Sequence, residues 1–240
     1  MREGPIIFGG ERVRATLEDR KTMTRRTRGL ECVNSYPGLL SGDSGGLGPL
    51  GYRGLEKTDY NLKPSAKKEF RKNPGIFHWF LGMSKDGREL NPIPVKCPYG
   101  QPGDRLWVKE ALYSSLQSCG TRGYRRINYD ADGTMVDPHK DWRWERNYLP
   151  SIFMPRWASR ITLEITGIRV ERVQDISESD AKAEGVDAWF PYTESLRQYA
   201  REGGSYRNGF HRLWNEINGG RGYGFELNPW VWVIEFARVA

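Results

Sequence analysis

Several absences narrow the classes of protein to which this 240-residue sequence can belong. No stretch of about 18 apolar residues occurs, so we expect no membrane-spanning helix. Residues 1–10 have no basic segment followed by a long apolar one, so we expect no secretory signal. Cysteine is scarce, odd in number and without a CxxC spacing, with only Cys32, Cys97 and Cys119. This pattern argues against a disulfide scaffold or a structural zinc site and favours a reducing cytoplasm.

The sequence also lacks the signatures of some common enzyme classes. It contains no Walker loop and no HExxH, and its predicted strands and helices do not alternate as in a Rossmann fold. Its three histidines are not clustered and stand at His78, His139 and His211. We therefore expect neither a metal nor a cofactor.

Composition predicts a compact core that carries polar loops. Hydrophobic residues make up 38%, but aromatic residues make up 12%, a content that disordered chains lack. Glycine is frequent, at 28 residues, which favours long irregular excursions. Lys and Arg number 37 against 30 Asp and Glu, giving a net charge of +7. That excess is consistent with an anionic partner, and its position along the chain matters more than its size.

The hydrophobic pattern predicts an α+β fold. The predicted elements are a strand at 5–8, a helix at 11–20, an extended segment at 21–28, a strand at 105–111, a strand at 161–170, a helix from Ser177 to Glu184, a helix around 210–217 and a strand at 230–236. Gly167 shifts the phase of its strand, as a bulge or a barrel corner does. The last strand is apolar on both faces, as in a closed β-barrel capped by helices.

Two regions interrupt this pattern. Residues 29–91 are rich in glycine with little periodicity, and within them we expect a short basic helix at 65–72 and an apolar patch at 76–81. A second irregular excursion covers 114–150, with a hairpin turn at 130–133. Both regions are predicted to be insertions.

The segment Arg20–Arg28 contains five cations and no acid. One interpretation is a solvated basic edge. The other is an anion pocket, in which Thr22 and Thr24 share a strand face and Lys21 precedes them. A hydroxyl attacks a carbonyl when a neighbouring amine accepts its proton, which requires a neutral lysine. Burial and neighbouring cations would lower the pKa of Lys21, whereas a nearby carboxylate would raise it.

At this point the chain resembles a known family. Its motifs Lys21-Thr22-x-Thr24-x-Arg26, Pro102–Val108, Ala181-x-x-Glu184-Gly185 and Asn228–Phe236 are similar, in that order, to motifs of ASCH domains in the PUA-like superfamily. The segments Cys97–Asp104 and Met154–Arg160 resemble phage and prophage members of that family. The resemblance covers a predicted core of 1–28, 92–112, 150–186 and 228–239, with insertions at 29–91, 113–149 and 187–227.

The resemblance implies a small PUA-like β-barrel flanked by helices, with a cleft for a nucleotide or nucleic acid. Small relatives hydrolyse N4-acetylcytidine to cytidine and acetate with a Lys, a Thr and a Glu. Carried over to this sequence, Thr24 would be the nucleophile, Lys21 its activator, and Glu184 would position water or hold the lysine.

Other residues are candidates for contacts with the substrate. They are Arg25, Arg26, Trp107, Glu110, Arg156 and Trp157. Arginine suits a phosphate or acyl oxygen, and tryptophan can stack on a base. Two of these residues have plainer alternatives: Trp107 as a tryptophan of the barrel core, and Glu110 as a surface acid at a strand end.

Three functions stay open on this evidence. The first is an amidohydrolase acting on an N4-acyl cytidine or a related modified base. The second is a module that binds RNA or modified phage DNA without catalysis, and the third is a nuclease acting on RNA. Cations in the insertions favour a polymeric partner, because polymers reward phosphate contacts. We expect a location in the cytoplasm of a bacterial host, and the oligomeric state stays undetermined.

Overall fold

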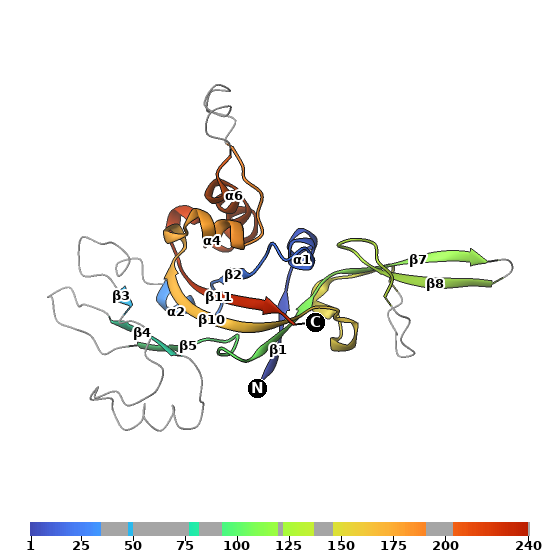
Figure 1. Ribbon diagram of the computed structural model, residues 1–240, viewed down its shortest axis with the longest axis horizontal. Helices are drawn as coiled ribbons and strands as arrows, with labels where there is room; N and C mark the ends of the chain where they lie inside the picture. The colour runs from blue at the N-terminus through green and yellow to red at the C-terminus, as the bar shows by residue number, and fades with distance from the viewer. Residues whose placement is uncertain are drawn as a thin grey trace.

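The computed structural model describes residues 1–34, 48–49, 77–81, 93–119, 122–136, 146–190 and 204–239, and its architecture is α+β as predicted (Figure 1). A five-stranded sheet forms its body. In spatial order its strands are β1 (Glu3–Ile7), β6 (Arg105–Lys109), β10 (Thr162–Arg172), β11 (Trp230–Arg238) and β2 (Met23–Arg26). β1 and β6 run parallel, and the other neighbours pair antiparallel.

This sheet is open across the residues described, whereas we expected a closed barrel. Its edge strands β1 and β2 are not neighbours in the hydrogen-bonded strand order. A side chain connects them instead: Arg26 Nη2 donates to the carbonyl oxygen of Ile7 at 2.8 Å. The Arg26 guanidinium also lies over the Phe8 ring, 5.6 Å from its centroid. Side chains, rather than a backbone ladder, therefore fill the space between the two edges.

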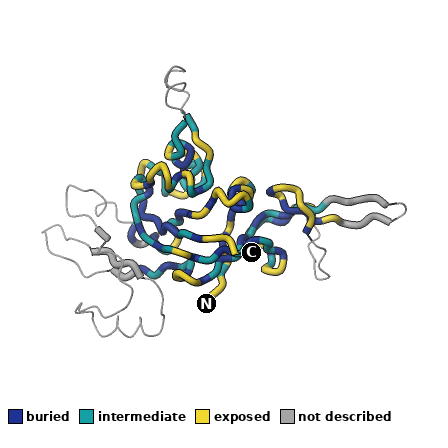
Figure 2. The backbone as a smooth tube through the Cα atoms, in the orientation of Figure 1, coloured by how far each residue is buried: buried dark blue, intermediate teal, exposed yellow. Residues whose placement is uncertain are grey.

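The strand β11 lies inside the sheet and is buried on both faces, as its apolar run predicts (Figure 2). One face contributes Trp230, Trp232, Ile234 and Phe236 to the larger hydrophobic core. The other face contributes Val231 and Val233 to a second core. The predicted phase shift in β10 is also confirmed, because its register with β11 shifts between Ile165 and Gly167.

The longest α-helices among the described residues are α1 (Gly10–Leu17), α4 (Glu178–Ala183) and α6 (Tyr206–Asn218). Figure 1 shows α4 and α6 together on one side of the sheet. The predicted cap of α4 is present, since Ser177 Oγ accepts from the backbone N–H of Asp180 at 3.0 Å. None of the helices in these ranges combines the length and apolar character needed to cross a membrane.

Two segments predicted to be insertions belong partly to the core. Phe210 and Trp214 of α6 are buried in the second core, so 187–227 is not a peripheral insertion throughout. Leu30 and Val33, beside and within α2 (Glu31–Asn34), are buried in the larger core. The apolar periodicity of α6 predicts a buried helix face. The insertion bounds were instead set by the positions of the family motifs, which take no account of that periodicity.

The region around 114–150 is more regular than predicted. It contains a long hairpin of β7 (Leu112–Cys119) and β8 (Arg122–Tyr129), joined at its base by β9 (Tyr148–Leu149), and the hairpin projects from the body (Figure 1). The predicted turn is confirmed, because Gly133 N donates to Tyr129 O at 2.8 Å. The two strands have little alternation of apolar and polar residues, so the hydrophobic pattern did not predict them.

The remaining elements are short. They are β3 (Gly48–Pro49), β4 (Phe77–Leu81), β5 (Ile93–Lys96), η2 (Ser151–Phe153), η3 (Arg156–Ala158), η4 (Val173–Asp175), η5 (Gly219–Arg221) and η6 (Phe225–Leu227). The apolar patch predicted at 76–81 coincides with β4, which pairs with β3 and β5. The basic helix predicted at 65–72 lies outside the described residues.

Candidate active site

Lys21 and Glu184 form a buried ion pair. Lys21 Nζ donates to Glu184 Oε2, to the Glu184 carbonyl and to the Met23 carbonyl, each at 2.7 Å. Lys21 is 2% exposed and Glu184 is 4% exposed. All three hydrogens of the ammonium group therefore have acceptors, and the pair is held in one geometry.

Two chain turns bring this pair together. After α1, the backbone N–H groups of Arg20 and Lys21 both donate to the Ala15 carbonyl, at 2.8 and 3.0 Å. After α4, Gly185 adopts a left-handed conformation with φ +76°. A Cβ at Gly185 would lie 2.8 Å from the Cβ atoms of Ala15 and Lys21. Glycine therefore permits the close approach at which Lys21 and Glu184 pair as a β-bridge.

The surroundings of Lys21 lower its pKa to about 8. Burial is the largest cause, because it disfavours the charged amine. Glu184 opposes this effect, and repulsion by Arg26 and Arg12 adds to it. The neutral amine is thus accessible near neutral pH, as a general base requires.

Arg25 holds Glu184 from the other side. Its guanidinium donates to Glu171 Oε1 at 2.9 Å, to Asp180 Oδ2 at 2.8 Å and to Glu184 Oε1 at 3.4 Å. Its side chain has 0% exposure, and it lies over the Phe210 ring. Because carboxylates already occupy its donors, Arg25 acts as a positioning residue for Glu184.

A cleft of about 520 Å³ opens beside this pair. Thr24 and Glu184 both line it, whereas Lys21 is not among the described lining residues and lies behind them, in contact with Glu184. Among its described lining residues, Glu184 is the one acid, against the cations Arg12, Arg25, Arg26, Arg28, Lys109 and Arg221. Aromatic lining comes from Tyr99, Phe210 and Trp214. The cleft therefore combines a hydroxyl, an ion pair, aromatic surface and a strong excess of positive charge.

Two threonines, Thr24 and Thr27, are among the described lining residues of this cleft, and Thr24 is the one on the strand next to the ion pair. It lies in β2 opposite Ile234 of β11 and is 3% exposed. Thr22, which the sequence placed on the same face, is exposed and is not part of the described lining. The basic segment is thus a cleft wall rather than a solvated edge.

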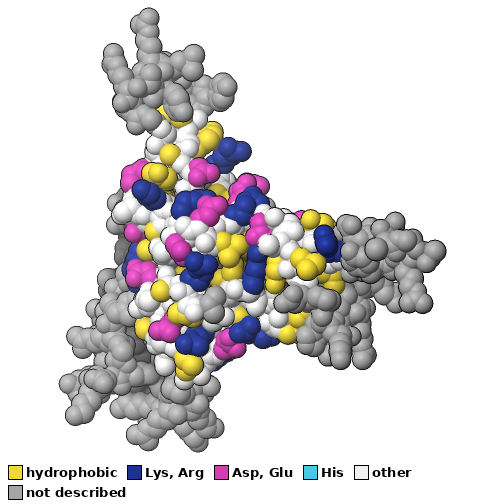
Figure 3. All heavy atoms as spheres, turned by 45° about the vertical axis from the view of Figure 1, so that its right-hand side comes forward, with side chains coloured by type: hydrophobic (Ala, Val, Ile, Leu, Met, Phe, Trp, Pro, Cys, Tyr) yellow, Lys and Arg dark blue, Asp and Glu magenta, His cyan; other side chains and the backbone are white. Residues whose placement is uncertain are grey.

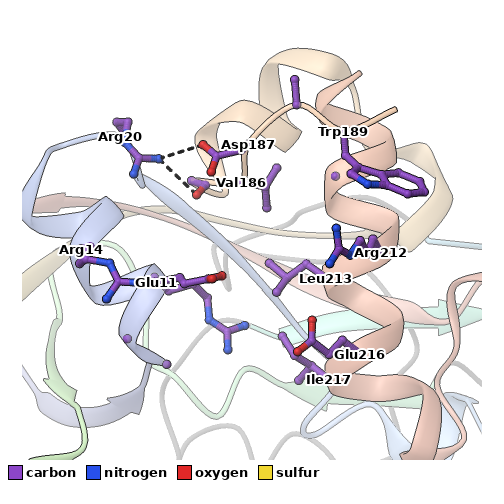
Figure 4. A pocket seen from close by; sticks show the side chains of 16 residues that line it. Glu11, Arg14, Arg20, Val186, Asp187, Trp189, Arg212, Leu213, Glu216 and Ile217 are labelled. Atoms are coloured by element: carbon purple, nitrogen blue, oxygen red, sulfur yellow. Dashed lines mark hydrogen bonds and ion pairs between the residues drawn. The ribbon is translucent and has the colours of Figure 1, made fainter. Parts of the chain in front are cut away.

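A second hollow of about 630 Å³ adjoins the cleft between α1 and α6 (Figure 4). The two share Gly9, Arg12, Leu213 and Ile217. Its charge is nearly balanced, with cations Arg12, Arg14, Arg20 and Arg212 and acids Glu11, Asp187 and Glu216. Arg20 Nη1 lies 3.9 Å from Asp187 Oδ1 across its upper rim (Figure 4). The larger hollow therefore has neither the charge excess nor the Lys21–Glu184 pair.

Sequence reasoning missed Arg12. It lies in α1, and an isolated arginine on an exposed helix gives no distinctive signal. Burial and repulsion by Arg26 lower its pKa. The preceding Gly9-Gly10 pair is the one sequence feature that relates to it. A Cβ at Gly9 would lie 3.2 Å from Arg12 Nη2, so glycine leaves room there for the guanidinium group.

Trp107, Arg156 and Trp157 lie outside the described cleft lining. Leu106 and Val108 of β6 are buried, so the alternate residue Trp107 is on the other face and is not a core tryptophan. Lys109 Nζ and Arg156 Cζ lie 5.4 and 5.7 Å from its ring centroid. Because Lys109 also lines the cleft, Trp107 and Arg156 lie next to the edge of the cleft, outside its described lining.

Figure 3 shows basic, acidic and apolar side chains interspersed over one face of the molecule.

Glu110 belongs to a separate buried ion pair. Its carboxylate accepts from Arg160 Nε and Nη2, each at 2.9 Å, and Arg160 also donates to Asp132 at 2.7 Å. Glu110 is 1% exposed, so it is not a surface acid, and it is not among the described cleft residues. Burial raises its pKa, against the effect of Arg160. This pair links the residue that follows β6 to the segment that precedes β10.

Replacing Arg160 with methionine is expected to destabilise the fold by about 3 kcal/mol, because Glu110 is then left buried without its partner. The free energy of unfolding in urea measures the loss. The double variant Arg160→Met with Glu110→Gln should recover much of it. Equal loss in the single and double variants would contradict a role for the unpaired charge.

Among the residues that the structure describes, no group of three or more His, Cys, Asp or Glu side chains is placed to hold a metal ion. Comparisons with protein-family models, curated proteins and solved structures found no match, so the geometry of the site carries the functional argument.

Proposed function

We propose that this protein is an ASCH-type amidohydrolase, with a PUA-like core, that removes an N4-acyl group from cytidine or a related modified nucleobase. The observation that carries the proposal is the buried Lys21–Glu184 pair beside a cationic cleft whose lining includes Thr24. The order of the motifs that resemble ASCH domains supports the same assignment.

In the first step, Thr24 Oγ1 forms a bond to the acyl carbonyl carbon and its proton passes to the neutral amine of Lys21. A neutral lysine keeps two N–H donors, enough for Glu184 and one carbonyl. The C–N4 bond then breaks, and the Lys21 ammonium returns the proton to the departing N4. Cytidine leaves, and the acyl group stays as an ester on Thr24.

The second step regenerates the enzyme. Glu184 positions a water molecule, whose oxygen attacks the ester carbon while Lys21 accepts its proton. The ester C–O bond breaks, and the proton passes from Lys21 to the Thr24 oxygen. The carboxylic acid departs. Arg25 keeps Glu184 in place, and Arg26 favours the neutral form of Lys21 by repulsion.

Activity is expected to rise with pH and to level off above a pKa of about 8 for Lys21. Burial sets this value below that of a free lysine, so the neutral base forms as pH increases through 8 and is about tenfold scarcer at pH 7 than at its plateau. Removing a neighbouring cation with Arg26→Gln should move the inflection to higher pH. The measurement is kcat/KM for N4-acetylcytidine from pH 6 to 10. A flat profile, or one that falls over this range, would contradict the role of Lys21.

One observation favours a binding module as the second candidate. Trp107, with Lys109 and Arg156 over its ring, continues from the cleft edge as a cationic and aromatic surface suited to RNA or modified DNA. Incubation with N4-acetylcytidine followed by chromatography separates the two candidates. Cytidine release supports the amidohydrolase, whereas salt-dependent RNA retention without release supports the binding module.

A further inference from the structure

Two half-buried arginines of the cleft, Arg12 and Arg26, have no carboxylate in ion-pair contact among the described residues. Within the described residues, the Arg12 side chain lines the cleft without a hydrogen bond or an ion pair. Arg26 donates one hydrogen bond, to the Ile7 carbonyl, and its Nε is buried without a partner. Arg25, between them in the same lining, contacts three carboxylates. Among the arginines of the described lining, Arg28 and Arg221 are exposed, so Arg12 and Arg26 are the half-buried ones without a carboxylate in ion-pair contact.

Holding these two guanidinium groups together is unfavourable in the empty protein. They lie close enough that Arg26 lowers the pKa of Arg12, in addition to the effect of burial. Glu184, the one acid of the described lining, is already engaged by Lys21 and Arg25. Glu11 and Glu216 of the adjoining hollow attract Arg12 without an ion-pair contact. A partly desolvated cation without a partner costs free energy, which an anion bound between the two would offset.

We propose that Arg12 and Arg26 form a clamp for the phosphate of a nucleotide unit, so that the cleft takes a nucleotide rather than a free nucleoside. The inference rests on the proposed function for the identity of the base, and Arg12 becomes the residue that determines specificity. Guanidinium groups match phosphate oxygens with paired, charge-assisted hydrogen bonds. A cleft of about 520 Å³ is within the usual range for a small ligand.

The other cations of the lining extend the same preference. Arg28, Lys109 and Arg221 line the same cleft. Glu184 is the one acid among the described lining residues. A neutral nucleoside gains nothing from this charge, whereas a phosphate gains from each nearby cation. The phosphate can belong to a 5′-monophosphate or to a phosphodiester in RNA, and both share the chemistry that Arg12 recognises.

Binding measurements test the clamp independently of catalysis. Calorimetry would compare cytidine 5′-monophosphate with cytidine on the wild-type protein and on Arg12→Gln. We expect the monophosphate to bind the wild type at least about tenfold more tightly, and this advantage to vanish in Arg12→Gln. Arg14→Gln is the matched control, because Arg14 is on the same helix, lies outside the described cleft lining and donates to the Ala131 carbonyl. It should keep the advantage.

Equal binding of the two ligands by the wild type, or equal losses in Arg12→Gln and Arg14→Gln, would overturn the clamp. Thermal unfolding of both variants excludes a folding defect as the cause. A cytidine dinucleotide that binds as tightly as the monophosphate supports an RNA substrate, and weaker binding supports a free nucleotide. If the monophosphate binds through Arg12 but its N4-acetyl derivative is not hydrolysed, the proposed reaction fails and the clamp stands.

Discussion

Replacing Thr24 with alanine is expected to lower kcat/KM for N4-acetylcytidine by about a thousandfold or more, because it removes the oxygen that we propose to form the acyl bond. The change deletes a hydroxyl and a methyl group from the cleft wall and leaves the Lys21–Glu184 pair intact. The midpoint of thermal unfolding should therefore change by only a few degrees. Initial rates of cytidine release measure the effect.

Thr22→Ala is the control for this variant. Thr22 is exposed two residues before Thr24, and its backbone already pairs with Ala183 and Phe236. We expect near wild-type rates from Thr22→Ala and partial activity from Thr24→Ser, which keeps a hydroxyl. A Thr24→Ala protein that retains most of its activity would remove Thr24 from the role of nucleophile.

Replacing Lys21 with methionine is expected to cause a loss of similar size, about a thousandfold, on the plateau above pH 8, and a smaller loss at lower pH, where the wild-type lysine is itself mostly protonated. Methionine keeps most of the apolar stem but has no amine to accept the threonine proton. The variant should also lose stability, by about 2–3 kcal/mol, because Glu184 keeps only its contact with Arg25 at 3.4 Å. Rates and urea unfolding are both measured.

A double variant separates catalysis from stability. Adding Glu184→Gln to Lys21→Met removes the unpaired charge and should recover part of the stability without restoring activity. If activity returned together with stability, Lys21 would have only a structural role.

The sequence predicted most of the elements that position the site. The Ser177 cap, the phase shift at Gly167 and the period of α6 are local signals, so they could be read without the fold. The approach of Lys21 to Glu184 is different in kind, because these residues are 163 positions apart. Their pairing came from the resemblance to ASCH motifs rather than from any local pattern, and the left-handed Gly185 gives it a steric basis.

The rest of the site depends on tertiary contacts that no local signal reports. Arg25 and Arg26 are adjacent in the sequence and equal in charge, yet Arg25 is held by carboxylates from three positions and Arg26 is not. The same limit applies to Glu110. Its position at a strand end is equally compatible with a surface acid, and only its tertiary pairing with Arg160 shows that it is buried. Arg12 shows it most clearly, since its role depends on which side of α1 meets the cleft.

The central claim is that the Thr24 cleft hydrolyses an N4-acyl cytosine. Its most direct test is incubation of the wild-type protein at pH 8 with N4-acetylcytidine and, separately, with its 5′-monophosphate, followed by chromatography. We expect each compound to yield its deacetylated product and acetate in a 1:1 ratio, and Thr24→Ala to release both at least about a thousandfold more slowly. Folded wild-type protein that releases no product from either compound, yet retains RNA in a salt-dependent manner, would contradict it.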